Sequence, residues 1–127
     1  MADVAKGEDK WSSGDSYEPY VGRWSRLVAA EFVNWLDAAD GGRWLDVGCG
    51  TGALTEGILD RAAPQQVVGM DPSEAYLASA RSRLSDRNVE LRSGDACALP
   101  FENETFDFAV SGLMLNFVAE PEKAISE

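Results

Sequence analysis

Apolar side chains form four short, nearly continuous runs along the chain, and the stretches between them show the spacing of helices. Apolar runs without strict alternation are typical of parallel strands that are covered on both faces. The pattern predicts strands near residues 43–48, 66–71, 88–92 and 106–111. Strands that alternate with helices form a parallel sheet with right-handed crossovers, so we expect an α/β protein with a Rossmann-like sheet.

A helix is predicted before the first strand, and two more follow between strands. The first has an apolar stripe at helical spacing, which we interpret as a packing face rather than a binding surface. The inner faces of the later helices are marked by Leu54 and Ile58, and then by Leu77, Ala80 and Leu84. The stripe of the first helix consists of Trp24, Leu27, Val28, Phe32, Trp35 and Leu36.

Length and composition indicate one domain behind a polar leader. The chain has 127 residues, of which 45% are hydrophobic, and no apolar run approaches the length that crosses a membrane. Residues 1–16 are rich in Gly, Ser and charged side chains and are expected to be a disordered leader, while residues 17–127 form the domain. The first twenty residues lack the apolar segment of a secretory signal.

Charge and residue usage exclude several kinds of function. With 22 acidic and 11 basic residues the formal net charge is −11, so nucleic acid and anionic membrane surfaces are poor partners. The chain contains no histidine, which argues against histidine-activated nucleophiles and against a transition-metal site. Two cysteines without a secretory signal fit a reduced, cytoplasmic protein.

The most informative segment is the end of the first predicted strand. Asp46 is followed by Gly48, Gly50 and Gly52, where the chain can turn sharply and approach a bound molecule closely. A helix begins just after this turn and directs its N-terminal amides to the same place. The arrangement indicates a binding site for a nucleotide-type cofactor.

The charge around this turn indicates which cofactor binds. The dinucleotide fingerprint Gly-x-Gly-x-x-Gly places its third glycine one residue later than this chain does, so a nicotinamide-dependent oxidoreductase is a weaker alternative. Residues 44–60 contain no Lys or Arg but three acidic residues, although phosphate sites usually include a cation. The segment therefore suits S-adenosylmethionine, which carries a sulfonium and an ammonium and no phosphate.

A second carboxylate follows at the distance expected for a ribose. Asp71 ends the second predicted strand, 19 residues after Gly52, and about 20 are expected for a carboxylate that accepts hydrogen bonds from ribose hydroxyls. The alternative role for Asp71 is to cap the next helix, but Ser73 is available for that task. A carboxylate only accepts hydrogen bonds, so it would repel a 2′-phosphate.

These segments together resemble the class I S-adenosylmethionine-dependent methyltransferases, and most closely the small-molecule branch of the quinone-biosynthesis type. The resemblance covers roughly residues 18–127 and implies methyl transfer to a small molecule, with strand order 3-2-1-4 and a ligand crevice between the first and fourth strands. The segments that carry it are LDVGCGTG (45–52), GMDPS (69–73), GDA (94–96) and FD (106–107).

The resemblance also implies roles for individual residues. Asp46 and the turn 48–52, with Cys49, would hold the methionine end of the cofactor. Pro72 would lie against the adenine ring, Asp95 would accept from the adenine amino group and the Ala96 amide would meet the ring. Gly112 would pass near the sulfonium.

Plainer alternatives accompany some of these roles. Asp46 and Asp95 could be ordinary turn aspartates, and Cys49 could be a small packing residue in the loop. Tyr20 and Arg23 could belong to a lid over the cofactor, with Tyr20 shielding the sulfonium and Arg23 pairing with the cofactor carboxylate. A solvated arginine and tyrosines packed on the rim of the domain are the competing interpretation.

The last residues bear on what the chain can do alone. The resemblance implies that family members continue with a further helix and three more strands, so the chain is expected to be truncated after the fourth strand and to lack much of the acceptor site. A cofactor-binding fragment without turnover is therefore the alternative function. Residues 106–110 would be an exposed edge strand, which predicts self-association or the need for a missing partner segment. No catalytic base can be named, and Asn116 is a candidate lining residue, with loop packing as its alternative.

Overall fold

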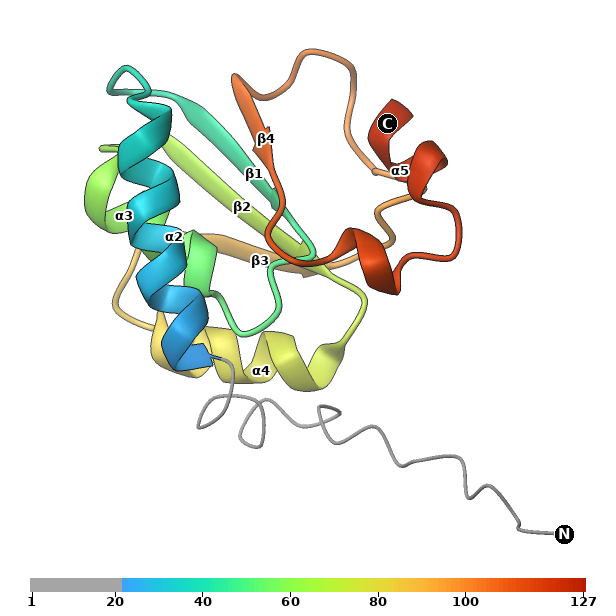
Figure 1. Ribbon diagram of the computed structural model, residues 1–127, viewed down its shortest axis with the longest axis horizontal. Helices are drawn as coiled ribbons and strands as arrows, with labels where there is room; N and C mark the ends of the chain where they lie inside the picture. Colours follow the sequence, from blue (N-terminus) through green and yellow to red (C-terminus); the bar gives the residue numbers. More distant parts are fainter. Residues whose placement is uncertain (1–21) are drawn as a thin grey trace, which may run out of the picture.

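The computed structural model describes residues 22–127, and the predicted leader and Tyr20 lie outside the described residues. Helices and strands alternate from α2 to β3 as the apolar runs predict, whereas β4 follows β3 without a helix between them (Figure 1). The elements are α2 (Arg23–Leu36), β1 (Arg43–Val47), α3 (Ala53–Arg61), β2 (Gln66–Asp71), α4 (Glu74–Arg83), β3 (Glu90–Ser93), β4 (Phe108–Val110), the short 3₁₀ helix η2 (Leu115–Phe117) and α5 (Pro121–Ser126).

The four strands form one parallel sheet in the order β3-β2-β1-β4, which confirms the predicted Rossmann-like topology. The strand order reverses between β1 and β4, because β2 and β3 lie on one side of β1 and β4 lies on the other. Ligands of open α/β sheets bind at the carboxyl ends of the strands at such a reversal. The topology therefore places a binding crevice after β1 and β4.

Strand β4 is shorter than predicted and begins at Phe108 rather than at residue 106. Asp107 instead pairs with Arg43: its carboxylate accepts from the Arg43 backbone N–H at 2.8 Å and from two guanidinium nitrogens at 3.2 Å. These hydrogen bonds hold the pKa of Asp107 below its usual value. The pair fixes the start of the edge strand against the start of β1.

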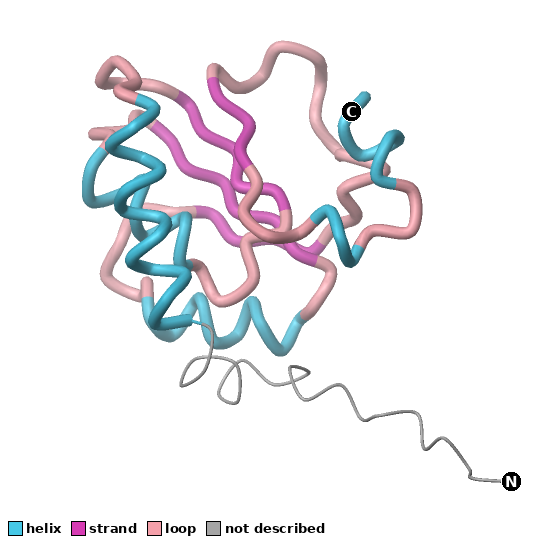
Figure 2. Tube along the Cα trace, viewed as in Figure 1, coloured by secondary structure: helices cyan, strands magenta, loops and turns pink. Residues whose placement is uncertain are grey.

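Helices α2 and α3 lie over one face of the sheet (Figure 2, where strands are magenta and helices cyan), and the main apolar core lies between these helices and the strands. Trp44 of β1 is fully buried and stacks on Phe108 of β4, with ring centroids 4.3 Å apart. Helices α2 and α3 complete this layer, and α4 packs against β2 and β3. The buried residues of the core cluster are Ala29, Val33, Trp44, Leu54, Ile58, Ala62 and Val67.

The prediction that the apolar stripe of α2 is its packing face is largely wrong. The helix buries Ala29 and Val33, while most of the large apolar side chains of the stripe are exposed. Where α2 crosses α3, a Cβ at Gly57 would lie only 3.5 Å from atoms of Ala29, so small side chains at the crossing let the two backbones approach. The close contact turns the larger side chains outward. The exposed members are Trp24 (64%), Leu27 (57%), Val28 (61%) and Trp35 (77%).

Among residues 22–127, no helix is both long enough and apolar enough to span a bilayer.

Candidate functional site

A cavity of about 1070 Å³ opens at the carboxyl ends of β1 and β4, where the topology predicts a crevice. It brings together residues from five separate segments of the chain, so the three predicted aspartates share one cleft. Of the predicted cofactor-binding residues, the cavity is lined by Asp46, Gly48, Cys49, Gly50, Asp71, Pro72, Asp95, Ala96 and Gly112.

The loop between β1 and α3 forms the floor of this cavity. Gly48, Gly50 and Gly52 have φ angles of 72°, 55° and 93°, a region that favours glycine. The N–H groups of Gly48 and Cys49 both donate to the Met70 carbonyl, at 2.7 and 3.0 Å, which fastens the loop to β2. A Cβ built on Gly50 would have no protein atom within 4 Å, so the loop leaves open space on that side.

Gly52 has a different position from the other predicted cofactor residues, because it does not line the cavity. A Cβ at this position would lie 3.1 Å from Leu84 Cδ1 and 3.4 Å from Ala80 Cβ. Its glycine is therefore required by the left-handed backbone and by the close packing of the loop on α4.

Asp46, the second-last residue of β1, has a carboxylate with only one of its two oxygens hydrogen-bonded within the described residues. The residue is 1% exposed, and Thr55 Oγ1 donates to its Oδ2 at 2.6 Å. Its Oδ1 is buried and has no hydrogen-bond partner among the described residues. Burial raises the pKa of Asp46 to about 6, against the lowering effect of the Thr55 hydrogen bond. A buried carboxylate oxygen without a partner is unusual, and a cationic ligand would satisfy it.

Thr55 is the residue of this group that sequence reasoning misses. It is fully buried in the first turn of α3, between the apolar residues Leu54 and Ile58. The sequence signal for Thr55 is a hydroxyl residue on the inner face of the helix after the glycine loop, nine residues after the aspartate of the preceding strand.

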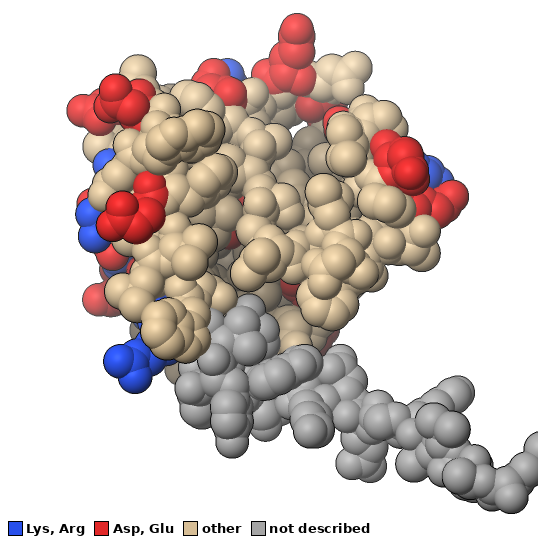
Figure 3. All heavy atoms as spheres, in the orientation of Figure 1, with Lys and Arg blue, Asp and Glu red and all other residues tan. Residues whose placement is uncertain are grey.

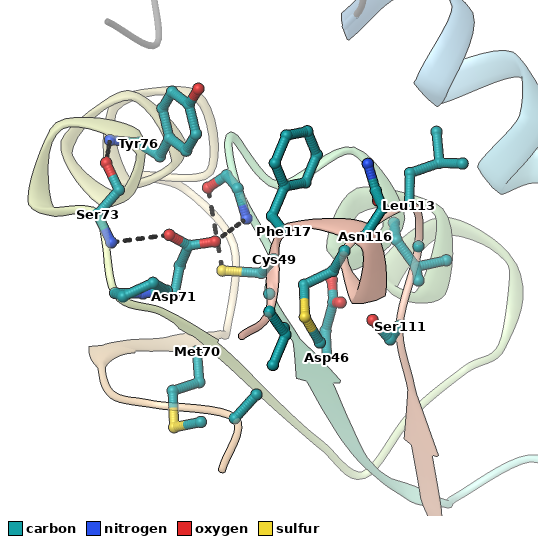
Figure 4. Close-up of a pocket in the computed structure, with 18 of the residues that line it drawn as sticks. Asp46, Cys49, Met70, Asp71, Ser73, Tyr76, Ser111, Leu113, Asn116 and Phe117 are labelled. Atoms are coloured by element: carbon teal, nitrogen blue, oxygen red, sulfur yellow. Dashed lines mark hydrogen bonds between the residues drawn. The ribbon is translucent and has the colours of Figure 1, made fainter. Parts of the chain in front are cut away.

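Asp71 ties the glycine loop to the start of α4. Its Oδ2 accepts from the Gly50 N–H at 2.9 Å and its Oδ1 accepts from the Ser73 N–H at 2.8 Å (Figure 4). Ser73 is the N-cap of α4, because its side chain accepts from the Tyr76 N–H. Burial raises the pKa of Asp71, and the two N–H groups oppose that shift. Each carboxylate oxygen can accept more than one hydrogen bond, so capacity for a ligand hydroxyl remains.

Asp95 begins a tight turn after β3. Its Oδ1 accepts from the Cys97 N–H at 2.9 Å, the contact of an ordinary turn aspartate. The side chain is nevertheless exposed and lines the cavity, and Ala96 beside it is buried. Both interpretations of Asp95 are therefore compatible with its position.

The charged residues that line the cavity are predominantly acidic. Its charged lining residues within the described part of the chain are Asp46, Asp71, Asp95, Glu120 and Lys123. Phosphate groups would meet carboxylates on its floor, whereas a ligand with positive charge would be stabilised there. Within residues 22–127, no group of three or more His, Cys, Asp or Glu side chains could hold a metal ion.

The sequence matches the family described as "Methyltransferase domain" over residues 45–127, a range that contains nearly all the residues of the cavity floor. The chain belongs to the class I S-adenosylmethionine-dependent methyltransferase family.

Curated relatives agree with this membership. The chain is similar to a phosphatidylethanolamine N-methyltransferase of Cereibacter sphaeroides, with 36% identity over 98% of this chain and 60% of that protein. It is also similar to a demethylmenaquinone methyltransferase of Renibacterium salmoninarum, with 39% identity over 83% of this chain and 41% of that protein. The chain therefore spans about half the length of these curated relatives.

Solved methyltransferase structures have the same fold. The S-adenosylmethionine-bound structure of an amino pentose methyltransferase from Micromonospora echinaspora superimposes with a TM-score of 0.67 and 34% identity, over 85% of this chain and 47% of that one. A putative S-adenosylmethionine-dependent methyltransferase from Methanococcus maripaludis superimposes with a TM-score of 0.75, over 91% of this chain and 57% of that one. At 17% identity, this second likeness concerns the fold alone.

In this methyltransferase domain, the mouth of the cavity is apolar although its floor is acidic. Its apolar lining includes Val28 and Phe32 of α2 and Leu113 and Phe117 from the segment after β4. Leu113 and Phe117 are 74% and 80% exposed, and in the view of Figure 4 Phe117 lies between Tyr76 and Leu113. Figure 3 shows mainly uncharged surface between α2 and the segment after β4, with Asp and Glu toward the rim. Asn116, a candidate from the sequence, lies in this lining.

Neither residue of the predicted lid, Tyr20 or Arg23, is found at the cofactor site in the described part of the chain. Tyr20 lies outside the described residues, and Arg23 is exposed in the first turn of α2, where it does not line the cavity. The predicted pairing of Arg23 with a cofactor carboxylate stays a prediction.

Proposed function

We propose that this domain binds S-adenosylmethionine in the cavity after β1 and β4 and serves methyl transfer to a small molecule. The observation that carries the proposal is the buried Asp46 Oδ1 atom, which lacks a partner among the described residues and belongs to an acidic cavity. The cofactor ammonium is a ligand group that would satisfy this oxygen. Membership of the methyltransferase family supports the same ligand.

The main predicted cofactor contacts are proposed for residues that line this cavity. Asp46 would accept from the ammonium, and Asp71 would accept from the ribose hydroxyls while it holds the loop through Gly50. Asp95 and the Ala96 amide would meet the adenine. Pro72 would lie against the adenine ring, and Gly112 would lie near the sulfonium.

The acceptor is proposed to be a small molecule with an apolar portion, methylated on a nitrogen, oxygen or carbon atom. The cavity volume of about 1070 Å³ is slightly above the roughly 300–1,000 Å³ of small-molecule sites, which leaves space for a second molecule. When bound, the cofactor supplies an activated methyl group for in-line displacement. The task of the protein is then to align the acceptor and exclude water, and the apolar side chains at the mouth suit that task.

A second candidate function is cofactor binding without turnover by this chain alone. It is favoured by the length of the relatives, because this chain spans only 60% and 41% of the two curated proteins above. A methyl-transfer assay on this chain and on a longer clone, with quinol and aminolipid acceptors, separates the two candidates. Turnover by this chain would exclude the second one.

Calorimetric titration with S-adenosylmethionine, S-adenosylhomocysteine and NAD tests the cofactor assignment. We expect binding of the first two and none of NAD. Asp46→Asn should lower the affinity for S-adenosylmethionine at least about tenfold, because it removes the charge opposite the ammonium. Asp60→Asn is the matched control, since Asp60 is an exposed acid that pairs with Arg87 outside the cavity. Equal losses in the two variants would refute the role of Asp46.

The remaining proposals concern location and partners. Cys49 and Cys97 are free and form no disulfide, in keeping with a reduced, cytoplasmic location. The net charge of −11 supports small-molecule partners over nucleic acid or anionic membranes. Strand β4 is proposed to pair with a second copy of the chain through the edge that has no partner strand within residues 22–127.

A further inference from the structure

The glycine loop is fastened to β2 in its first half by the amides of Gly48, Cys49 and Gly50. Its second half contains the peptide unit that joins Thr51 to Gly52 and leads into α3. The Gly52 N–H of this peptide unit donates to the Cys49 carbonyl at 2.9 Å. The other end of the same peptide unit, the Thr51 carbonyl, accepts from Arg83 Nη1 at 3.1 Å. One peptide plane is therefore fixed from both of its polar ends.

Arg83 is well placed to hold this peptide plane because a second contact fixes its own orientation. Its other terminal nitrogen, Nη2, donates to Glu56 Oε2 at 2.7 Å. The two side chains are 25% and 34% exposed, so both are partly withdrawn from water. A planar guanidinium held by two acceptors has a defined direction, which a lysine ammonium would lack. Arg83 is the last residue of α4, so it connects that helix to the loop and to α3.

The held peptide belongs to the cavity itself. Thr51 is 2% exposed and lines the cavity, and Gly50 before it leaves open space for a ligand. The adjoining φ angle at Gly52 is 93°, a value at which most side chains are strained. A loop of this kind depends on outside contacts to keep one conformation.

We propose that Arg83 is a positioning residue for the cofactor: by holding the Thr51 carbonyl, it sets the shape of the loop that receives the methionine end of S-adenosylmethionine. Arg83 does not line the cavity and touches no ligand in this role. The inference rests on the proposed function for its ligand, but the effect on loop order is independent of any ligand.

Arg87 provides a matched control. Its Nη1 donates to Asp60 Oδ1 at 2.7 Å, the same length as the Arg83–Glu56 contact, and the two pairs join the same two parts of the fold. The Arg87 and Asp60 side chains are 31% and 50% exposed. Neither of them lines the cavity. Arg83→Met and Arg87→Met therefore both remove an ion pair near the end of α4, but only the first removes the contact with the loop.

The first measurement is the hydrogen-exchange rate of the Gly50 and Gly52 backbone amides in the ligand-free chain, monitored by NMR. We expect Arg83→Met to speed exchange at these amides at least about tenfold, and Arg87→Met to leave them unchanged. The second measurement is the affinity for S-adenosylhomocysteine, which should fall about tenfold in Arg83→Met and less than about twofold in Arg87→Met. Unchanged loop exchange in Arg83→Met, or equal loss of affinity in both variants, would overturn the proposal.

Arg83→Lys is the second variant in case Arg83→Met does not fold. A lysine keeps the charge beside Glu56 but loses the planar pair of donors. We expect faster loop exchange and weaker binding than in the wild-type chain, and wild-type values for both would overturn the proposal. Absence of S-adenosylhomocysteine binding by the wild-type chain would instead refute the proposed function, while the exchange measurement would still decide the role of Arg83.

Discussion

Thr55 donates its hydroxyl hydrogen to Asp46 Oδ2 at 2.6 Å, and both side chains are almost completely withdrawn from solvent. The contact fixes the plane of the carboxylate, so that one oxygen is engaged by α3 and the other has no partner among the described residues. It also favours the ionised form of a carboxyl group that burial and the neighbouring Asp71 push toward protonation. A buried anion with one open oxygen is a preorganised partner for a cation.

The first prediction follows from this contact. Thr55→Val keeps the shape of the side chain and removes the donor, so the pKa of Asp46 should rise above its value of about 6. Affinity for S-adenosylhomocysteine is expected to fall as pH drops through the Asp46 pKa, and in Thr55→Val this fall should begin at a higher pH. Calorimetric titration between pH 5.5 and pH 7.5, in steps of about half a unit around that pKa, gives the profile.

The control for this experiment is Thr55→Ser, which retains the hydroxyl and should restore the wild-type pH profile. A loss of affinity in Thr55→Val that is the same at every pH would indicate a packing defect instead. That result would contradict the role assigned to the hydrogen bond.

The second prediction concerns stability and pH. The pKa of Asp46 rises from its ordinary 3.8 to about 6 on folding, so the folded chain binds this proton more tightly than the unfolded chain. This contribution to stability is full below about pH 3.8, is lost as pH rises to about 6, and amounts to roughly 3 kcal/mol. Asp46→Asn should therefore raise the free energy of unfolding at pH 7 by a similar amount and bind the cofactor more weakly.

Urea unfolding at pH 7 measures this effect, and Asp60→Asn serves as the control because Asp60 is an exposed acid. A less stable Asp46→Asn variant at pH 7 would show that the ionised carboxylate is not a cost to the apo fold. Stability gained by removing a group that binds the ligand is the trade-off expected at a functional site.

Much of this site can be predicted from the sequence because its parts are local. Asp46 is the second-last residue of β1 and Asp71 is the last residue of β2, and parallel strands of one sheet bring their carboxyl ends to the same edge. The three glycines of the loop indicate, from the sequence alone, positions where the backbone turns with a positive φ angle. The strand order and the shared cavity follow from these features together with the family resemblance.

Other features depend on tertiary contacts that have no local signature. The helical period of α2 does not show which face is buried. The close approach of Ala29 to Gly57 of α3 buries the face with small side chains and leaves most of the larger ones exposed. Arg83 looks like a solvated residue at the end of a helix, and only the fold brings it to Thr51, 32 residues away. Gly52 has the expected backbone, but its packing on α4 is visible only in three dimensions.

The third prediction compares two glycines of the loop. Gly50→Ala should cost about 1–2 kcal/mol of stability, the strain of a left-handed alanine, and its methyl group enters open space beside the ligand. Gly52→Ala adds steric overlap, since its Cβ would lie 3.1 Å from Leu84, so its cost should be larger. Urea unfolding and titration with S-adenosylhomocysteine should show the greater loss of stability in Gly52→Ala and a loss of affinity in Gly50→Ala. Equal stability of the two variants would contradict the packing role of Gly52.

The last prediction concerns the edge of the sheet. Within the described residues, β4 pairs with β1 on one side only, and apolar side chains nearby are exposed, including Ile125 at 71%. An unpaired apolar edge strand can pair with another chain, so sedimentation velocity should show association that increases with concentration.

Ala109→Lys tests whether β4 mediates this association. Ala109 is exposed at the centre of the strand, and a charge there should shift the chain toward monomer. Ala78→Lys on α4 is the matched control, because it makes the same change at another exposed alanine. A wild-type chain that stays monomeric at high concentration would contradict self-association. Equal shifts in the two variants would assign the effect to net charge rather than to the edge, because added positive charge changes the repulsion between copies of an acidic chain wherever it is placed.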